Sequence, residues 1–193
     1  MKTLIRAVLL LVVIVIVGAG FAVWYVQRNG MSARGEPTAV ETAVALRLRH
    51  LSIPSADRDR TNPLKPTADN MREGMEHFAD HCAVCHANSG NGDTPIGMGL
   101  YPKPPVLRDA RTQSISDGEL FSIIDNGIRF TGMPAFGGPG GHDAEDSWRL
   151  VLFIRHLPAI TDQELKTMET MNPKAPDDKD EAKPGTPAHH HGG

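Results

Sequence analysis

Cysteine and aromatic residues are scarce in this sequence of 193 residues. Only 2 cysteines are present, which excludes a disulfide-stapled scaffold, a four-thiolate zinc site and a cysteine-ligated iron–sulfur cluster, because each needs more thiols. The 6 Phe, 2 Trp and 2 Tyr would leave a core short of its bulkiest fillers. The cysteines must therefore act as one pair, and the core has room for a bound group. The length itself excludes a multidomain enzyme.

Basic clusters and β-strand patterns are also missing. Residues 1–28 hold three basic residues and no acidic ones, so the rest of the chain keeps 17 of the 20 Lys and Arg against all 23 Asp and Glu, a net charge of −6. Nucleic-acid binding requires clustered Lys and Arg and is therefore excluded. With 19 Gly, 15 Pro, no strand pattern and no internal repeat, the sequence predicts a small all-α protein.

The first 28 residues contain a long apolar run. Residues 7–26 are uncharged and span about 30 Å as a helix, the thickness of a bilayer core. The pair Trp24-Tyr25 at the far end is typical of a membrane interface, which favours a retained transmembrane anchor over 1–28. The alternative is a cleaved signal peptide, with its cleavage site among the small residues 18–22. Lys2 and Arg6 favour a cytoplasmic N-terminus.

Composition divides the remaining chain into three parts. Residues 29–66 are predicted to form a tether, because four prolines interrupt them and 41–51 fit a helix only weakly. Residues 67–160 are predicted to form the folded domain. Residues 161–193 are predicted to hold a short helix and then a disordered tail rich in Lys, Asp, Pro and Gly.

Four helices are predicted from residue 67 onward. Apolar spacing and capping residues place them at 67–82, at 117–126 after the capping box Ser116…Glu119, at 143–157, and at 161–171 after the capping box Thr161…Glu164. Residues 87–115 have no periodicity and many Gly and Pro. A long irregular segment inside a small domain is unusual, and we expect it to wrap around a large ligand.

Both cysteines lie in the sequence Cys82-Ala83-Val84-Cys85-His86. This Cys-x-x-Cys-His arrangement is the c-type haem attachment motif, in which two thiols bind the vinyl groups of one porphyrin and the adjacent His binds the iron. A thioredoxin-like dithiol would need a βαβ setting that the sequence does not predict. The motif therefore predicts one covalent haem c held by Cys82, Cys85 and His86.

The second axial ligand of the iron is predicted to be Met133. It lies 47 residues after His86, and the following Pro134 favours an extended backbone at the methionine. Met98 competes but lies only 12 residues after His86 and suits loop packing better. A ligating His usually donates its other ring N–H to a carbonyl, which Pro104 or Pro105 would supply.

Taken in order, these motifs resemble the class I monohaem c-type cytochromes, in particular the bacterial group related to the haem subunit of cbb3-type oxidases. The resemblance covers about residues 70–157 and rests on the following segments: Gly74-x-x-x-Phe78, the Cys82–His86 motif, Pro105-Val106-Leu107, Asp117-Gly-Glu-Leu120, Asn126-Gly127-Ile128, Met133-Pro134-Ala135-Phe136 and Trp148. It implies a fold of three to four helices around the haem, with Gly74 and Phe78 meeting Trp148, Leu152 or their neighbours. It also implies that the Pro105 carbonyl accepts from the proximal His86.

The resemblance implies electron transfer and not enzymatic catalysis. Haem c is attached on the outer side of the energy-conserving membrane, so we expect a single-pass inner-membrane protein with the haem domain in the periplasm. It would carry single electrons between respiratory or periplasmic redox proteins, or accept them as a subunit of an oxidoreductase. A ligated His/Met pair leaves no open position on the iron for substrate.

Two other functions remain open. A gas-binding or sensor haem protein would have a labile methionine ligand. A periplasmic metal-handling protein would use the run His189-His190-His191, since neutral imidazoles bind divalent cations.

Overall fold

The computed structural model describes residues 1–138 and 143–173, and its regular elements in these ranges are all helices. The all-helical fold predicted from the sequence is thereby confirmed. The chain forms two compact units, residues 1–35 and residue 36 onward.

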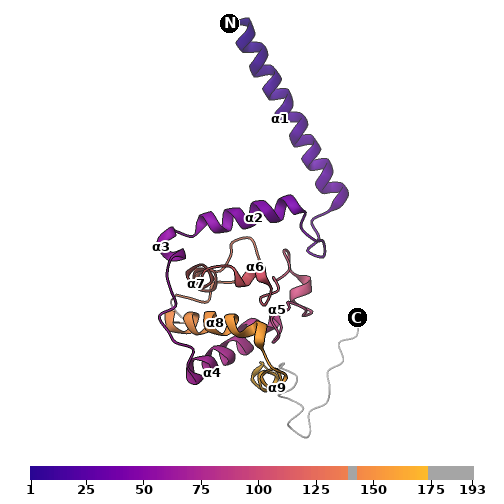
Figure 1. Ribbon diagram of the computed structural model, residues 1–193. Helices are drawn as coiled ribbons and strands as arrows, with labels where there is room; N and C mark the ends of the chain where they lie inside the picture. The colour runs from indigo at the N-terminus through magenta and orange to yellow at the C-terminus, as the bar shows by residue number, and fades with distance from the viewer. Residues whose placement is uncertain (139–142, 174–193) are drawn as a thin grey trace, which may run out of the picture. The chain divides into compact units, whose positions relative to one another are not determined.

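The first unit is helix α1, Lys2–Asn29 (Figure 1). It is the one helix among the described residues that is long and apolar enough to cross a membrane, and none of its residues is buried. Lys2 and Arg6 lie in its first turns and Arg28 in its last. These bounds agree with the apolar run found in the sequence.

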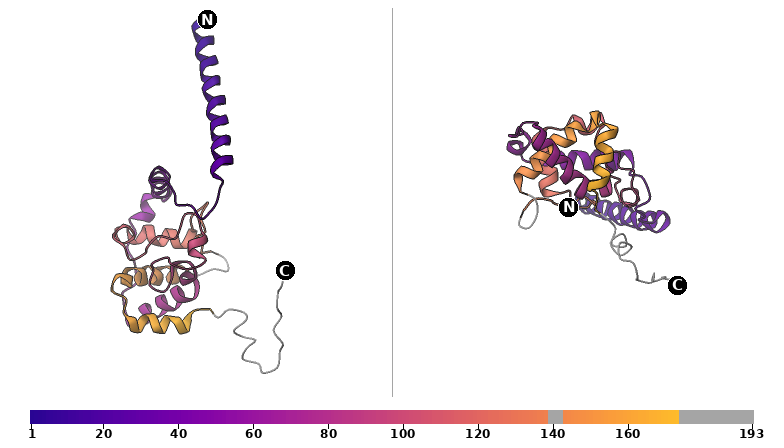
Figure 2. Two further views of the ribbon diagram at one scale, coloured as in Figure 1. Left: turned by 90° about the vertical axis from the view of Figure 1, so that its right-hand side faces the viewer. Right: turned by 90° about the horizontal axis from the view of Figure 1, so that it is seen from below.

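The second unit is a stack of helices. In chain order they are α2 (Ala39–Ser52), α3 (Ser55–Arg58), α4 (Ala68–His77), the π-helical turn η1 (Phe78–Cys82), α5 (Ala83–His86), the 3₁₀ turn η2 (Gly97–Gly99), α6 (Ala110–Gln113), α7 (Asp117–Asn126), α8 (Ala144–His156), the 3₁₀ turn η3 (Leu157–Ala159) and α9 (Asp162–Met171). Within this unit α2 lies at one edge and α9 at the opposite edge, with α7, α8 and α4 between them (Figures 1 and 2).

Side-chain caps explain where the longer helices of the second unit begin. An oxygen of the residue before each helix accepts a hydrogen bond from a free backbone N–H of the first turn, at Thr38, Thr67, Ser116, Asp143 and Thr161. Thr161 and Glu164 form the predicted capping box of α9. At α7 only half of the predicted box is present: Ser116 accepts from the Glu119 N–H, while the Glu119 carboxylate turns away to other partners.

The core is centred on the crossing of α4 and α8. Gly74 lies so close to α8 that a Cβ there would overlap the backbone carbonyl of Arg149 and touch the Phe153 side chain. Phe78 and Phe153, exposed by 0% and 1%, pack with ring centroids 5.2 Å apart. The expected meeting of Gly74 and Phe78 with α8 is therefore observed, at Arg149 and Phe153.

Trp148 joins α8 to α7 through an aromatic contact that the sequence did not predict. Its ring stacks on Phe121 of α7, with centroids 4.3 Å apart and planes at 22°. The Arg60 guanidinium lies over both rings, 4.4 Å from the Phe121 centroid and 5.1 Å from that of Trp148. A cation over two stacked aromatic faces ties the segment before α4 to the pair α7 and α8.

Part of the segment predicted to be a tether is folded. Helices α2 and α3 belong to the second unit, and Arg49 and His50 of α2 pair with Glu119 of α7. The hydroxyl of Ser116, the residue that caps α7, donates to the Arg58 carbonyl of α3 at 2.7 Å. The boundaries drawn at residues 29–66 and 67–160 stay a prediction, but residues 39–58 are not an extended linker.

Candidate functional site

The two cysteines lie at the end of one continuous helical segment. Helix α4 passes without a break into η1, which ends at Cys82, and then into α5, which contains Cys85 and His86. Both cysteines are free and partly buried. Burial raises the pKa of the Cys82 thiol to about 12, with a smaller contribution from Cys85, and burial also raises the pKa of Cys85. Reactive dithiols of the thioredoxin type need the opposite, a lowered pKa.

His86 holds a buried nitrogen without a full hydrogen bond. Its Nδ1 is enclosed and makes no hydrogen bond of normal geometry. Burial lowers the pKa of His86, and the backbone of Pro105, which has only a carbonyl to offer, opposes this by raising it. The Pro105 carbonyl therefore lies near the His86 ring without forming a hydrogen bond of normal geometry to Nδ1. The neighbouring Pro104 faces Gly92 instead.

The irregular segment after the motif folds back onto it. The Gly92 N–H donates to the His86 carbonyl at 2.9 Å, and the Leu107 N–H donates to the Gly90 carbonyl at 2.7 Å. A Cβ at Gly97 would overlap the Cys85 carbonyl, so this position admits only glycine without a shift. The segment thus folds back onto the Cys-x-x-Cys-His motif at Gly92 and Gly97, and its wrapping around a ligand stays a prediction.

Thr94 is a positioning residue that sequence reasoning missed. Its hydroxyl donates to the Val84 carbonyl at 2.8 Å and accepts from the Gly97 N–H at 2.8 Å. One side chain therefore joins the back of the haem motif to the start of η2. The signal was available, because a Thr three residues before Gly97 has the spacing of a helix N-cap.

Met133 lies in a loop held against the end of α7. Its carbonyl accepts from the Ile128 N–H at 3.1 Å, and its own N–H donates to the Thr131 hydroxyl at 3.1 Å. Further along, the Phe136 N–H donates to the Ile124 carbonyl at 3.1 Å. The Phe136 ring meets His81 of η1 edge-on, with centroids 6.1 Å apart. The loop thus spans from α7 to the helix that bears the cysteines.

The other methionines occupy different surroundings. Met98, the competing ligand, lies in η2 with 50% of its surface exposed. Met168 is fully buried, and Met71, Met75 and Met171 pack against the core. Their positions agree with the packing roles expected for them.

The histidines near the motif are paired with acids. His77 Nε2 lies 3.1 Å from an Asp146 oxygen, and His81 Nδ1 lies 3.3 Å from one of Asp80. Among residues 1–138 and 143–173 no three His, Cys, Asp or Glu side chains are grouped as a metal site. The run His189-His190-His191 lies outside the described residues.

Comparison with known proteins gives one family. A solved chain of the Kuenenia stuttgartiensis reducing HAO-like protein complex Kustc0457/Kustc0458 is 23% identical with a TM-score of 0.46; the match covers 54% of this chain and 50% of that one. The chain thus spans about half the length of that relative. No curated protein matches it. The family described as cytochrome C oxidase, cbb3-type, subunit III matches residues 69–154. Residues 69–154 are therefore a cytochrome c domain of the cbb3-type oxidase subunit III family.

Proposed function

We propose that this protein is a membrane-anchored monohaem cytochrome c that carries single electrons between respiratory or periplasmic redox partners. The family of residues 69–154 supports haem-based electron transfer. One observation supports the proposal of a single covalent haem c. Cys82, Cys85 and His86 lie at the end of one helical segment, and the loop that follows folds back onto them.

The residues present fit a haem c. Cys82 and Cys85 would form the two thioethers, and His86 would bind the iron through Nε2. A ligating imidazole needs a partner for its other nitrogen, and the buried Nδ1 of His86 has the Pro105 carbonyl beside it. Met133, in a loop fixed by its own backbone hydrogen bonds, would be the second axial ligand. The iron of a bound haem supplies reversible one-electron oxidation and reduction.

The protein's own contribution is to hold and enclose these ligands. In the holoprotein the Pro105 carbonyl would accept from His86 Nδ1–H and orient the ring, and the Thr94 hydroxyl anchors the loop that covers the motif. The bonds from Ile128 and Thr131 hold the methionine backbone in one conformation. With His86 and Met133 both bound to the iron, no coordination position would be open to a substrate, which suits electron transfer.

Helix α1 would anchor the domain to the inner membrane. Its length and apolar surface fit a span, and Lys2 and Arg6 favour an N-terminus in the cytoplasm and a haem domain in the periplasm. A cytochrome confined near a membrane meets its partners at a high effective concentration, so weak and transient docking is sufficient.

The test of the ligand assignment is Met133→Ala, with Met98→Ala as the matched control. In the ferric holoprotein, Met133→Ala should abolish the methionine-to-iron charge-transfer band and lower the reduction potential, whereas Met98→Ala should leave both unchanged. In the ferrous state only Met133→Ala should bind carbon monoxide. A band that survives in Met133→Ala and is lost in Met98→Ala would overturn the assignment. Carbon monoxide binding by the wild-type ferrous protein would favour the gas-binding function instead.

A further inference from the structure

Helix α2 has two opposite faces, and both carry apolar side chains. The inner face points into the second unit and contains partly or fully buried residues, namely Thr42, Leu46, Arg49, His50 and, just past the helix, Ile53. The outer face contains four exposed aliphatic residues at helical spacing, namely Val40 (72% exposed), Val44 (52%), Leu48 (61%) and Leu51 (58%). Positions 40, 44, 48 and 51 form one continuous stripe.

Contacts at both ends prevent this stripe from turning inward. At the C-terminal end of α2, His50 Nδ1 lies 3.0 Å from a Glu119 oxygen and Arg49 Nη2 lies 3.4 Å from the other. At the N-terminal end, the Tyr101 hydroxyl donates to a Glu41 oxygen at 3.0 Å. Glu119 is nearly buried, with 7% of its side chain exposed, so these pairs anchor the inner face of α2 to α7. The outward orientation of the stripe is therefore a property of the fold.

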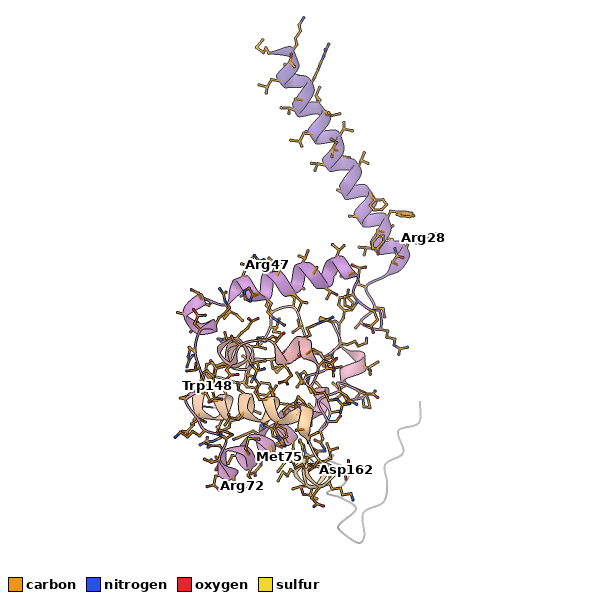
Figure 3. The ribbon with its side chains drawn as sticks, viewed as in Figure 1. Arg28, Arg47, Arg72, Met75, Trp148 and Asp162 are labelled. Carbon is orange, nitrogen blue, oxygen red and sulfur yellow. The ribbon has the colours of Figure 1, made fainter. Side chains whose placement is uncertain are left out.

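The chemistry of the outer face suits a lipid surface. Arg47, labelled in Figure 3, lies among the stripe residues and is exposed. No Asp or Glu occupies the exposed positions 40, 43, 44, 47, 48 and 51. The exposed Glu41 lies beside the stripe, and its two carboxylate oxygens accept from the Thr38 N–H and the Tyr101 hydroxyl. An apolar stripe with a basic side chain at its margin is typical of helices that lie in a membrane interface, where Arg reaches the anionic headgroups.

The covalent chain also limits how far α2 can lie from a membrane. Nine residues separate the end of α1 at Asn29 from the start of α2 at Ala39. Fully extended they span about 30 Å. If α1 spans the bilayer, the first turn of α2 is confined to this distance from the interface. The connecting segment holds one basic and one acidic residue, Arg34 and Glu36.

We propose that the outer face of α2 lies on the membrane surface and inserts Val40, Val44, Leu48 and Leu51 at the level of the lipid headgroups. The inference rests on the proposed anchoring by α1. Because α2 is fixed to α7 and to the loop at Tyr101, docking of α2 also fixes which side of the cytochrome domain faces the lipid. The domain is then held in one orientation and does not tumble on a flexible tether.

The test is photolabelling of the full-length holoprotein in vesicles of phosphatidylcholine and phosphatidylglycerol. One lipid carries a diazirine in its acyl chain, and adducts are mapped by peptide mass spectrometry. We expect adducts on α1 and on the outer face of α2, and none on Thr42 or Leu46. The double variant Val44→Ser/Leu48→Ser leaves Val40 and Leu51 unchanged. It should lower the adduct yield at these two residues several-fold relative to the adduct yield on α1. The control variant Ala45→Ser changes an exposed residue outside the stripe and should leave the adduct yield at Val40 and Leu51 unchanged.

The substituted side chains are exposed, so the variants should keep the haem spectrum and unfolding transition of the wild type. Labelled α1 with unlabelled α2 would overturn the inference and leave the anchoring intact. An unlabelled α1 together with an unlabelled α2 would overturn both. A dimer whose outer α2 face is shielded from the label would overturn the inference by assigning that face to a second copy of the chain.

Discussion

Gly74 sets how closely α4 and α8 approach. Its missing side chain leaves the space that the Arg149 carbonyl occupies, and this brings Phe78 against Phe153 one turn further along. The haem motif begins four residues after Phe78, at Cys82. A single absent methyl group therefore positions the helical segment that carries the Cys-x-x-Cys-His motif.

Gly74→Ala should destabilise the domain. The added methyl would overlap backbone, which cannot move as a side-chain end can, so we expect a loss of about 2–3 kcal/mol in the free energy of unfolding. Urea unfolding of the holoprotein measures it. Gly99→Ala is the control: a Cβ at Gly99 meets nothing within 4 Å, and its effect should stay within about 0.5 kcal/mol. Equal losses in the two variants would refute this account of the crossing.

At the level of elements, the acidic residue in the first turn of a helix has two different uses. Glu164 of α9 completes a capping box by accepting from the Thr161 N–H at 2.8 Å, and it also contacts His156 at 2.8 Å. Glu119 occupies the same position in α7 but holds α2 by its pairs with Arg49 and His50. The same Ser/Thr-x-x-Glu pattern thus caps α9 locally, whereas in α7 its glutamate joins the helix to α2.

Glu119→Gln should loosen α2 from α7. The substitution removes a nearly buried charge that faces Arg49 and His50, and we expect a loss of about 1–3 kcal/mol in unfolding free energy. Hydrogen exchange should rise over residues 39–58 more than over α4 and α8. Glu76→Gln removes an exposed pair with Arg72 instead and should change stability by less than about 0.5 kcal/mol. Unchanged exchange at 39–58 in Glu119→Gln would contradict the prediction.

The Glu164 cap should make α9 sensitive to acid. Burial alone would raise the pKa of its carboxyl, but hydrogen bonds from the Thr161 backbone and hydroxyl and the contact with His156 together lower it below 4.5. A carboxyl whose pKa is lowered by folding contributes stability above its unfolded pKa and loses it as the pH falls through the folded value. Stability should therefore decline below about pH 4.5 in the wild type.

Glu164→Gln provides the comparison for this decline. Gln keeps the hydrogen-bonding shape of a capping box but has no charge to titrate. Between pH 5 and pH 3, taken as a window of about two units around the ordinary Glu pKa, its unfolding free energy should fall less than that of the wild type. Parallel pH profiles for the two proteins would show that this carboxyl does not contribute to the acid dependence.

The whole molecule combines an apolar helix and a cytochrome c domain of ordinary size. The family match covers residues 69–154, yet three helices outside it belong to the same unit: α9 adds Met168 to the core, α3 packs on α7, and α2 pairs with Glu119 of α7. Met168 of α9 is fully buried, and Arg60 covers the Phe121–Trp148 stack. The folded unit thus extends beyond the segment that matches the family.

Membrane extraction and intact mass would settle the state of α1. The holoprotein should resist a carbonate wash and require detergent for release, because about 20 apolar residues in a bilayer hold a protein against salt and high pH. Its intact mass should equal the 20.9 kDa chain plus one haem. Release by carbonate, with a mass that lacks the first residues, would show that the segment is a cleaved signal.

Much of the fold was predictable because helix signals are local. Apolar spacing and caps lie within four residues of each other, so the sequence places α4, α7, α8 and α9 and the boundaries of α1 correctly. The helix over Ala39–Ser52 was predicted only weakly, because its apolar residues serve two opposite faces and the helical period is blurred.

The sequence by itself determined the helices, the apolar N-terminal segment and the Cys82–His86 motif, since each depends on residues a few positions apart. Only the tertiary structure turned Glu119 toward α2 and placed Trp148 on Phe121. These contacts join residues far apart in the chain. Their partners are selected by the packing of the whole unit, which no local pattern encodes.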